Sequence, residues 1–186
     1  TGNRKEALDL FIKATESDPQ LVPAWVNLAN GYVQLGKTQE AEISIRKSIE
    51  LNPNLFNSHL LLASILIGQN KLQEAIKPLR KTIELNPDFF QAHLNLGAVL
   101  KDLGHLQDAE QPLRKTIELQ PDFFQAHLNL GALLKDFGQL EDAEISTRKA
   151  IELNPDFAEA HSNLGIILRD LNQLQEAEIS TRKAIE

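Results

Sequence analysis

The sequence predicts an all-α array of stacked two-helix repeats, and three observations support this prediction. Prolines recur at a constant spacing of 34 residues, at Pro19, Pro53, Pro87, Pro121 and Pro155. Residues 81–110 and 115–144 are close to copies of each other. Within each unit, apolar residues recur three and four positions apart, as in a helix with one buried face. Because a unit of this length cannot bury its apolar face alone, neighbouring units must stack into a continuous core.

The prolines divide the chain into units of one register and indicate a single array without an internal linker. A half unit covers residues 1–21, and an incomplete unit covers residues 158–186. Four complete units lie between them, at 22–55, 56–89, 90–123 and 124–157. We therefore expect one repeat domain that spans all 186 residues.

Each unit predicts two helices, as the unit at 90–123 illustrates. An apolar stripe from Ala92 to Leu103 predicts a first helix, helix A, which Gly104 should end. A second stripe from Leu106 to Leu119 predicts helix B. Helix A is expected to start at the segment 86–88, Asn-Pro-Asp. Asn can cap free amides, Pro suits the first helical position, and Asp favours the positive end of the helix dipole.

Two further features of the helices lead to predictions. Small residues such as Gly97 and Ala109 should let helices A and B approach closely. Pro78 and Pro112 lie one turn inside their B helices. Since proline lacks an amide donor and can clash with the preceding turn, these helices should start late or bend locally.

Composition argues against several classes of function. The net charge of −7 disfavours nucleic-acid binding, which depends on clustered Lys and Arg. Without cysteine, disulfides, thiolate catalysis and cysteine-ligated zinc are excluded. The longest apolar runs, such as 60–63, fall far short of the roughly 20 residues of a membrane helix. We therefore expect no nucleic-acid partner and no membrane partner.

The first residues do not combine a positively charged start with an apolar segment, so no signal peptide is predicted. The sequence contains no methionine, which indicates a fragment or a processed product. A cytoplasmic location is the corresponding expectation.

The repeat resembles the tetratricopeptide repeat, whose Trp, Leu-Gly, Tyr, Ala, Phe and Pro positions are matched almost completely by Trp25, Leu28-Ala29, Tyr32, Ala41, Ile45 and Pro53. Later units have His59, His93, His127 and His161 in place of Trp25. The segment 156–165 is similar to repeats of protein O-linked N-acetylglucosamine transferases and of bacterial repeat proteins. The resemblance implies a right-handed superhelical solenoid of antiparallel helix pairs. It also implies a concave groove, lined by the A helices, that binds peptides or proteins.

A ladder of asparagines forms the candidate binding site. Asn27, Asn95, Asn129 and Asn163 follow the Trp or His position by two residues, and Leu61 interrupts the series. The resemblance places these asparagines on the concave wall. An amide offers an acceptor and two donors, so it can pair with the backbone of an extended peptide whatever its side chains are. Alternatively, the asparagines bond to each other or to nearby backbone and hold the superhelix together.

Charged pairs form two further ladders. Lys101-Asp102, Lys135-Asp136 and Arg169-Asp170 recur near the ends of the A helices. Lys101 and Lys135 are candidate peptide contacts, although solvated pairing between repeats is the favoured interpretation. On the B helices, the Arg-Lys pairs at 46–47, 80–81, 114–115, 148–149 and 182–183 predict a solvated outer face.

No metal, cofactor or catalytic group is predicted. Zinc needs ligand nitrogens about 2.0–2.1 Å from one ion, and histidines one repeat apart cannot converge so closely. We therefore expect the histidines to be packing residues. No set of nucleophile, base and orienting group is visible, so the chain is predicted not to be an enzyme.

The sequence therefore predicts a protein-interaction scaffold that binds a peptide or protein segment in its concave groove. The alternative is a substrate-presenting arm of a larger transferase whose catalytic domain lies outside this chain. The end of the chain lacks a polar capping helix. The side chains expected to remain partly uncovered there, and to permit self-association, are Leu164, Ile167, Leu168 and Leu171.

Overall fold

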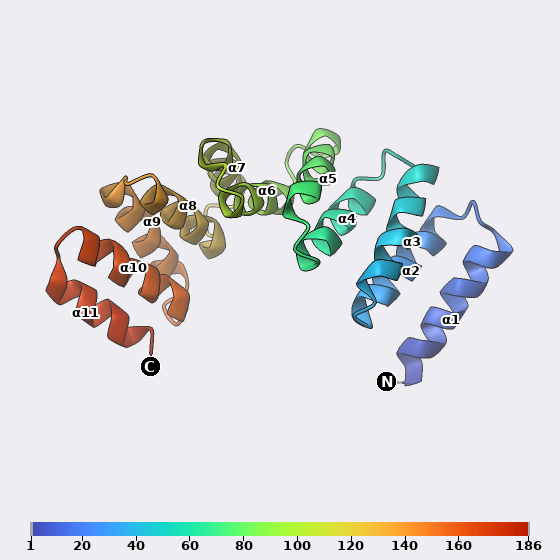
Figure 1. Cartoon of the computed structure of the whole chain (residues 1–186), viewed down its shortest axis with the longest axis horizontal. Helices are drawn as coiled ribbons and strands as arrows, with labels where there is room; N and C mark the ends of the chain where they lie inside the picture. Colours follow the sequence, from blue (N-terminus) through green and yellow to red (C-terminus); the bar gives the residue numbers. More distant parts are fainter. Residues whose placement is uncertain (1, 186) are drawn as a thin grey trace. The chain divides into compact units, whose positions relative to one another are not determined.

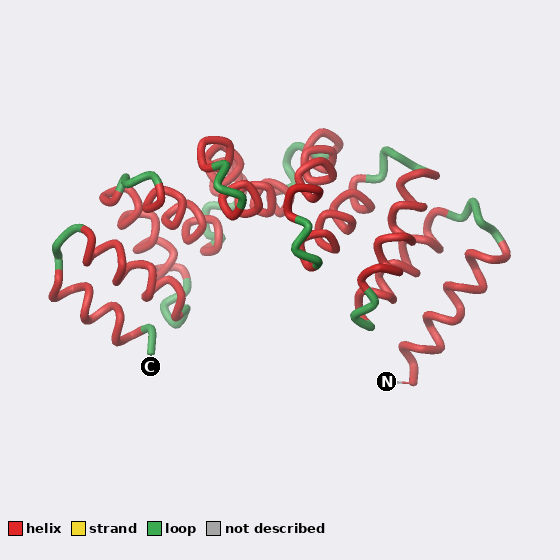
Figure 2. Tube along the Cα trace, in the orientation of Figure 1, coloured by secondary structure: helices red, strands yellow, loops and turns green. Residues whose placement is uncertain are grey.

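The computed structural model describes residues 2–185, and within them every regular element is a helix (Figure 1, Figure 2). The helices are α1 (Gly2–Ser17), α2 (Val22–Gln34), α3 (Thr38–Leu51), α4 (Phe56–Gly68), α5 (Leu72–Leu85), α6 (Phe90–Asp102), α7 (Leu106–Leu119), α8 (Phe124–Asp136), α9 (Leu140–Leu153), α10 (Ala158–Asp170) and α11 (Leu174–Lys183). The predicted all-α solenoid class is confirmed.

The helices repeat with the period of the sequence. The A helices are α2, α4, α6, α8 and α10, each of 13 residues. The B helices α3, α5, α7 and α9 have 14 residues each. Short loops join the helices, and within a repeat such as α2–α3, α4–α5, α8–α9 or α10–α11 the two helices run antiparallel and pack side by side.

The chain forms two compact units, which divide between Ala92 and His93. In the N-terminal unit, α1 packs on α2, α2 on α3, α3 on α4, and α4 on α5. In the C-terminal unit, α7 packs on α8, α8 on α9, α9 on α10, and α10 on α11. In these two series each helix packs mainly against its neighbours in sequence, as in a solenoid.

Small residues lie where the two helices of a repeat cross. Ala41, Ala75, Ala109 and Ala143 are fully buried. A Cβ atom at Gly97 would lie 2.6 Å from the Leu113 Cγ and 3.2 Å from the carbonyl oxygen of Ala109. At Gly131 the equivalent atom would collide with the Thr147 hydroxyl. The predicted close approach is confirmed, because these positions have no room for a larger side chain.

A left-handed residue follows each A helix at the same position of the repeat. Gly36, Gly104 and Gly138 occupy it with φ of 71°, 77° and 76°, and Asn70 and Asn172 replace glycine with φ of 58° and 61°. The residue after it donates its amide back into the helix, as Lys71 does to the carbonyl of Leu66 at 2.8 Å. This is the Schellman arrangement that satisfies the last carbonyls. The predicted end of helix A at Gly104 is confirmed.

The predicted start of helix A is wrong. Asn86 follows α5 as its C-terminal cap, and α6 begins only at Phe90. The equivalent Asn52 accepts a hydrogen bond from the amide of Asn54 at 3.1 Å and so forms an Asx turn. The Asn-Pro sequence shapes the loop between repeats, because its side chain bonds to the loop backbone and not to the next helix.

The prolines in the B helices do not delay them. α5 and α7 begin at Leu72 and Leu106, in the same register as α9 at Leu140. Pro78 and Pro112 are buried, and their carbonyls accept hydrogen bonds from the hydroxyls of Thr82 and Thr116 at 2.9 and 3.0 Å. The expected late start is wrong because packing, and not helix propensity, sets where the helix begins.

The end of the chain differs from expectation. Leu164, Ile167 and Leu168 of α10 are only 5%, 0% and 1% exposed, and Leu171 is half-buried. The expectation that they are uncovered is wrong, because α11 packs on α10 and covers them. The exposed large apolar side chains near this end are Leu174 and Ile179 of α11, and Ile185.

The left-handed position allows a test at Asn70. Asn70→Ala should destabilise the fold by about 1 kcal/mol, because a Cβ is unfavourable at positive φ without the local hydrogen bonding of asparagine. Asn70→Gly should leave the stability unchanged or slightly raised. Urea unfolding monitored by circular dichroism measures both, with Gly36→Ala as a matched control that should lose a similar amount. An alanine variant as stable as the glycine variant would contradict this explanation.

Candidate functional site

The asparagine ladder lies at one register of the A helices. Asn27 in α2 is exposed, while Asn95 in α6, Asn129 in α8 and Asn163 in α10 are partly exposed. Three of these residues belong to the C-terminal unit and Asn27 belongs to the N-terminal unit. The structure thus brings Asn129 and Asn163 onto helices that contact each other, since α8 also touches α10.

An aromatic contact joins the start of α8 to the start of α10. The ring of Phe124 meets the ring of Phe157, the residue before α10, edge to face with centroids 5.0 Å apart. In the N-terminal unit, Phe56 and Phe89 make the equivalent contact at 5.5 Å. Such pairs contribute about 0.5–1.5 kcal/mol beyond area burial. The sequence analysis missed this contact, although the repeated Phe at 89, 123 and 157 is its signal.

The amides of Asn129 and Asn163 make no hydrogen bond to any residue in the described part of the chain. Each side chain stands next to a buried leucine of the same helix, Leu130 or Leu164, which fixes the helix in the core. The two amides are consequently held at the surface with their donors and acceptors available.

Acidic residues extend the same face of the A helices. Asp136 and Asp170 follow Asn129 and Asn163 by seven residues, close to two helical turns, so each lies on the same side of the helix as the asparagine. Their side chains are 41% and 38% exposed. We call the residues Asn129, Asp136, Asn163 and Asp170 the A-face stripe. The sequence analysis missed the aspartates as site residues, although the seven-residue spacing was readable.

The lysines that were predicted to contact peptide are engaged within their own helices. Lys101 Nζ lies 3.4 Å from Asp102 Oδ1, and Lys135 Nζ lies 3.2 Å from Asp136 Oδ1. Arg169 pairs with Asp170 in the same way at 2.8 Å. The expected pairing between repeats is therefore wrong, because the neighbouring aspartate on the same helix is closer.

At the repeat position occupied by Trp25 or by histidine, a ring nitrogen forms a hydrogen bond to the loop between repeats. Trp25 Nε1 donates to the carbonyl of Pro19 at 2.9 Å, and His59, His127 and His161 bond through Nε2 to the carbonyl of the proline six residues earlier, at 2.7 to 2.8 Å. Because a carbonyl can only accept, Nε2 is the protonated nitrogen in these histidines. No cluster of three or more potential metal ligands occurs among residues 2–185.

The basic ladder of the B helices lies at the surface and pairs with glutamates of the same helix. Lys47 bonds to Glu50, and the equivalent lysines 115 and 149 bond to Glu118 and Glu152, at 2.6 to 2.8 Å. The glutamates are 67–68% exposed. Such pairs are solvated, as predicted, and each is worth little to stability.

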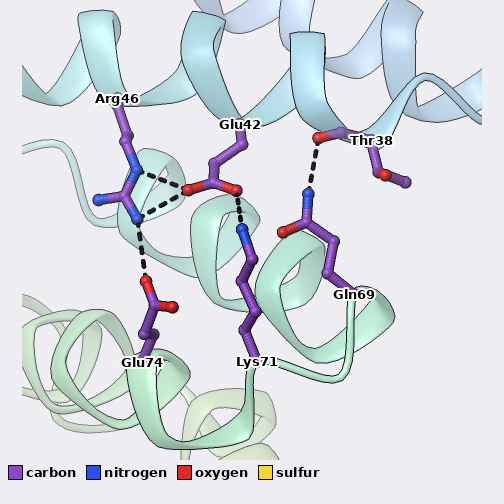
Figure 3. A network of polar contacts seen from close by, with 6 residues as sticks. All are labelled: Thr38, Glu42, Arg46, Gln69, Lys71 and Glu74. Carbon is purple, nitrogen blue, oxygen red and sulfur yellow. Dashed lines mark hydrogen bonds and ion pairs between the residues drawn. The ribbon is translucent and has the colours of Figure 1, made fainter.

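One polar network joins neighbouring repeats in the N-terminal unit (Figure 3). The Glu42 carboxylate of α3 accepts hydrogen bonds from Arg46 and from Lys71 of the next repeat, both at 2.8 Å, and Arg46 also reaches Glu74 at 3.6 Å. Gln69 donates to the carbonyl of Thr38 at 3.0 Å. In the C-terminal unit, Arg148 bridges Glu144 and Glu176, both at 2.7 Å.

The network shifts the titration of its members. The hydrogen bond from Lys71, reinforced by Arg46, lowers the pKa of Glu42 although partial burial opposes the shift. The hydrogen bonds to Glu144 and Glu176 raise the pKa of Arg148. The Glu42 shift arises first from Lys71 of the next repeat, whereas the Arg148 shift arises first from Glu144 of its own helix and then from Glu176 of the next repeat.

Comparison with protein families places repeat matches along most of the chain. Models described as tetratricopeptide repeat match residues 22–55 and 90–123, and also residues 113–145 and 147–179. A model described as TPR repeat matches residues 63–104. A search of curated proteins found no match.

Solved structures resemble the chain at low sequence identity. YrrB, described as a TPR protein with an unusual peptide-binding site, is 22% identical with a TM-score of 0.82, over 96% of this chain and 92% of its own. MamA from Desulfovibrio magneticus RS-1 is 21% identical with a TM-score of 0.84, over 88% of this chain and 93% of its own. PilF of Pseudomonas aeruginosa is 21% identical with a TM-score of 0.76, over 98% of this chain and 77% of its own. At these identities the similarity establishes the fold.

Within residues 2–185, no helix combines the length and the apolar character needed to cross a bilayer.

The position of Glu42 makes the network testable by pH. Because its pKa is lowered in the folded chain, its stabilisation is present above the unfolded pKa of about 4.3 and is lost as pH falls through the folded value. Glu42→Gln should cost about 0.5–1 kcal/mol at pH 7, and this difference should be smaller at pH 3. Urea unfolding at both pH values measures it.

Glu50→Gln is the matched control, because the Glu50 side chain is 67% exposed and pairs only within its own helix. This control should change stability little at either pH. A Glu42→Gln penalty that is equal at both pH values would show that the carboxylate charge is not the cause.

Proposed function

Because the chain belongs to the tetratricopeptide repeat family, we propose that it is a non-catalytic protein-interaction scaffold that binds an extended peptide along its A helices. The observation that carries this proposal is the pair of surface amides at Asn129 and Asn163. They lie at one register on contacting helices and have no hydrogen-bond partner in the described structure. YrrB, which shares the fold, is described as having a peptide-binding site, and this supports the proposal.

The repeat spacing suits an extended ligand. Packed helices lie about 8–10 Å apart, while an extended chain advances about 3.3 Å per residue. Each repeat therefore meets roughly every third residue of the peptide. An asparagine amide can donate to a peptide carbonyl and accept from a peptide N–H at each of these points. Asn95 of α6 occupies the same register and is the next candidate contact.

The charged pairs beside the asparagines add a second element. Lys135 and Asp136 lie at the end of α8, and Lys101 and Asp102 lie at the end of α6. We propose that Lys101 and Lys135 exchange their aspartate partners for acidic groups of the ligand. Asp102 and Asp136, once released, can then pair with basic groups of the ligand. Each net hydrogen bond contributes about 0.5–1.5 kcal/mol before ordering costs, so the expected affinity is weak.

The test is a triple variant, Asn95→Ala with Asn129→Ala and Asn163→Ala. A peptide selected on the wild-type chain from a display library of random short peptides should bind this variant at least about tenfold more weakly, because several backbone hydrogen bonds are lost. Fluorescence anisotropy measures the affinity, and circular dichroism should show an unchanged helical fold.

The matched control removes three exposed amides from B helices, by the changes Gln107→Ala, Gln111→Ala and Gln175→Ala. This variant should bind as the wild type does. Unchanged binding by the asparagine variant would refute the proposed contact. Loss of its fold would assign the asparagines a structural role in its place.

A further inference from the structure

A cavity of about 880 Å³ opens between α3, α4 and α5 of the N-terminal unit. We call it the α3–α5 groove. Its floor is formed by Leu62 and Leu66 of α4, and Ile49 of α3 and Ile76 of α5 form apolar walls. Its volume lies within the roughly 300–1,000 Å³ of typical ligand pockets. The groove involves the B helices, so it is separate from the A-face stripe.

The rim of this groove is positively charged. Its cationic side chains are Arg46, Lys77, Arg80 and Lys81, against two acidic ones, Glu74 and Glu84. Arg46 and Lys81 are already paired with glutamates. Lys77 and Arg80 are exposed and form no ion pair with the described residues of the N-terminal unit. In a chain with a net charge of −7, this excess of positive charge beside an apolar floor is a local exception.

The excess of positive charge at the groove arises from three residues of one repeat. α5 has Ile76-Lys77-Pro78, whereas α3, α9 and α11 have Glu-Ile-Ser at the same positions and α7 has Glu-Gln-Pro. In those four helices the glutamate pairs with the arginine four residues later, at 2.6 to 2.8 Å. Ile76 replaces this glutamate in α5, so Arg80 lacks its partner while the groove gains an apolar wall.

The equivalent cavity of the C-terminal unit lacks these properties. It lies between α9, α10 and α11, has a volume of about 370 Å³, and is lined by Ile151, Leu164 and Leu168. Its cationic residues, Arg148 and Lys183, are balanced by Glu152 and Glu176. Ile179 occupies the position of Lys77. Of these two cavities, only the α3–α5 groove combines a larger apolar floor with an excess of positive charge.

We propose that the α3–α5 groove binds an acidic amphipathic helix of a partner protein. Apolar side chains three and four positions apart on that helix enter the groove above Leu62 and Ile76, and glutamates or aspartates beside them pair with Lys77 and Arg80. The charges select acidic partners and speed their association, while the apolar contacts hold the complex together. This site does not depend on the asparagines of the proposed peptide-binding function.

The test uses a fluorescein-labelled, helix-forming peptide with leucines at positions i, i+3 and i+7 flanked by glutamates. A matched peptide has lysine in place of every glutamate. On the whole chain, the acidic peptide should bind saturably in fluorescence anisotropy and weaken as salt rises, and the lysine peptide should not bind. Ile76→Glu should weaken the acidic peptide about tenfold or more, because it neutralises Arg80 and places a carboxylate in the groove.

Ile76→Glu should preserve the fold, since glutamate occupies this position in α3, α7, α9 and α11. Circular dichroism checks this. The matched control is Gln111→Glu, which adds the same charge at an exposed position of α7 and should leave binding unchanged. The triple asparagine variant should also bind the acidic peptide normally, which separates this proposal from the peptide-binding function.

Four results would overturn the proposal. Equal binding of the acidic and lysine peptides, or no saturable binding of either, would remove the charge selection. Equal affinity of the wild type and Ile76→Glu would place binding elsewhere on the chain. A dimer in sedimentation velocity that dissociates in Ile76→Glu would assign the groove to a second copy of this chain.

Discussion

The close contact between the two helices of each repeat is the constraint on which the rest of the structure depends. At Gly131 a single added carbon would collide with Thr147, and Ala143 on the facing helix is fully buried. Because the backbones approach so closely, larger apolar residues beside the crossing, such as Leu133 and Leu134, reach the neighbouring helices and are fully buried. A larger residue at the crossing would separate the helices and weaken all of these contacts together.

Contacts between repeats are built differently from contacts within them. The Phe124–Phe157 ring contact joins α8 to the loop before α10, and the bridge of Arg148 to Glu176 joins α9 to α11. Such nearest-neighbour interactions make stability approximately a sum over repeats and their interfaces. One repeat can therefore change its surface without disturbing the helix register of the others. The segment 76–78 of α5 is such a change, since α5 keeps the length and start of the other B helices.

The two proposed sites, the A-face stripe and the α3–α5 groove, differ in the kind of recognition that we propose for them. The asparagine amides suit peptide backbone, which every sequence shares, so they supply affinity with little selectivity. The groove combines apolar lining with positive charge, and under our proposal this combination selects partners by their composition. A scaffold with both surfaces can hold a general ligand at one and a particular acidic partner at the other.

Much of the fold was readable from the sequence because burial repeats with the period of the chain. The apolar stripes of both helices, the small residues at Gly97 and Ala109 and the turn at Gly104 all lie where the sequence predicts them. Asparagine was misassigned at position 86, because its side chain can cap a helix or close a loop turn equally well. The Phe124–Phe157 contact was missed because its two residues are far apart in the sequence, and spacing along one helix does not reveal such a contact.

By itself, the sequence determined the 34-residue period, the two helices of each repeat and the candidate asparagines, because these follow from local spacing along one helix. Only the tertiary structure decided that Lys135 pairs with Asp136 in place of a neighbouring repeat, and that α11 covers Leu168. It alone joined Ile76, Lys77 and Leu62 around one groove. Periodicity identifies which face of a helix is buried, whereas ion pairs and cavities depend on distances between helices that only packing sets.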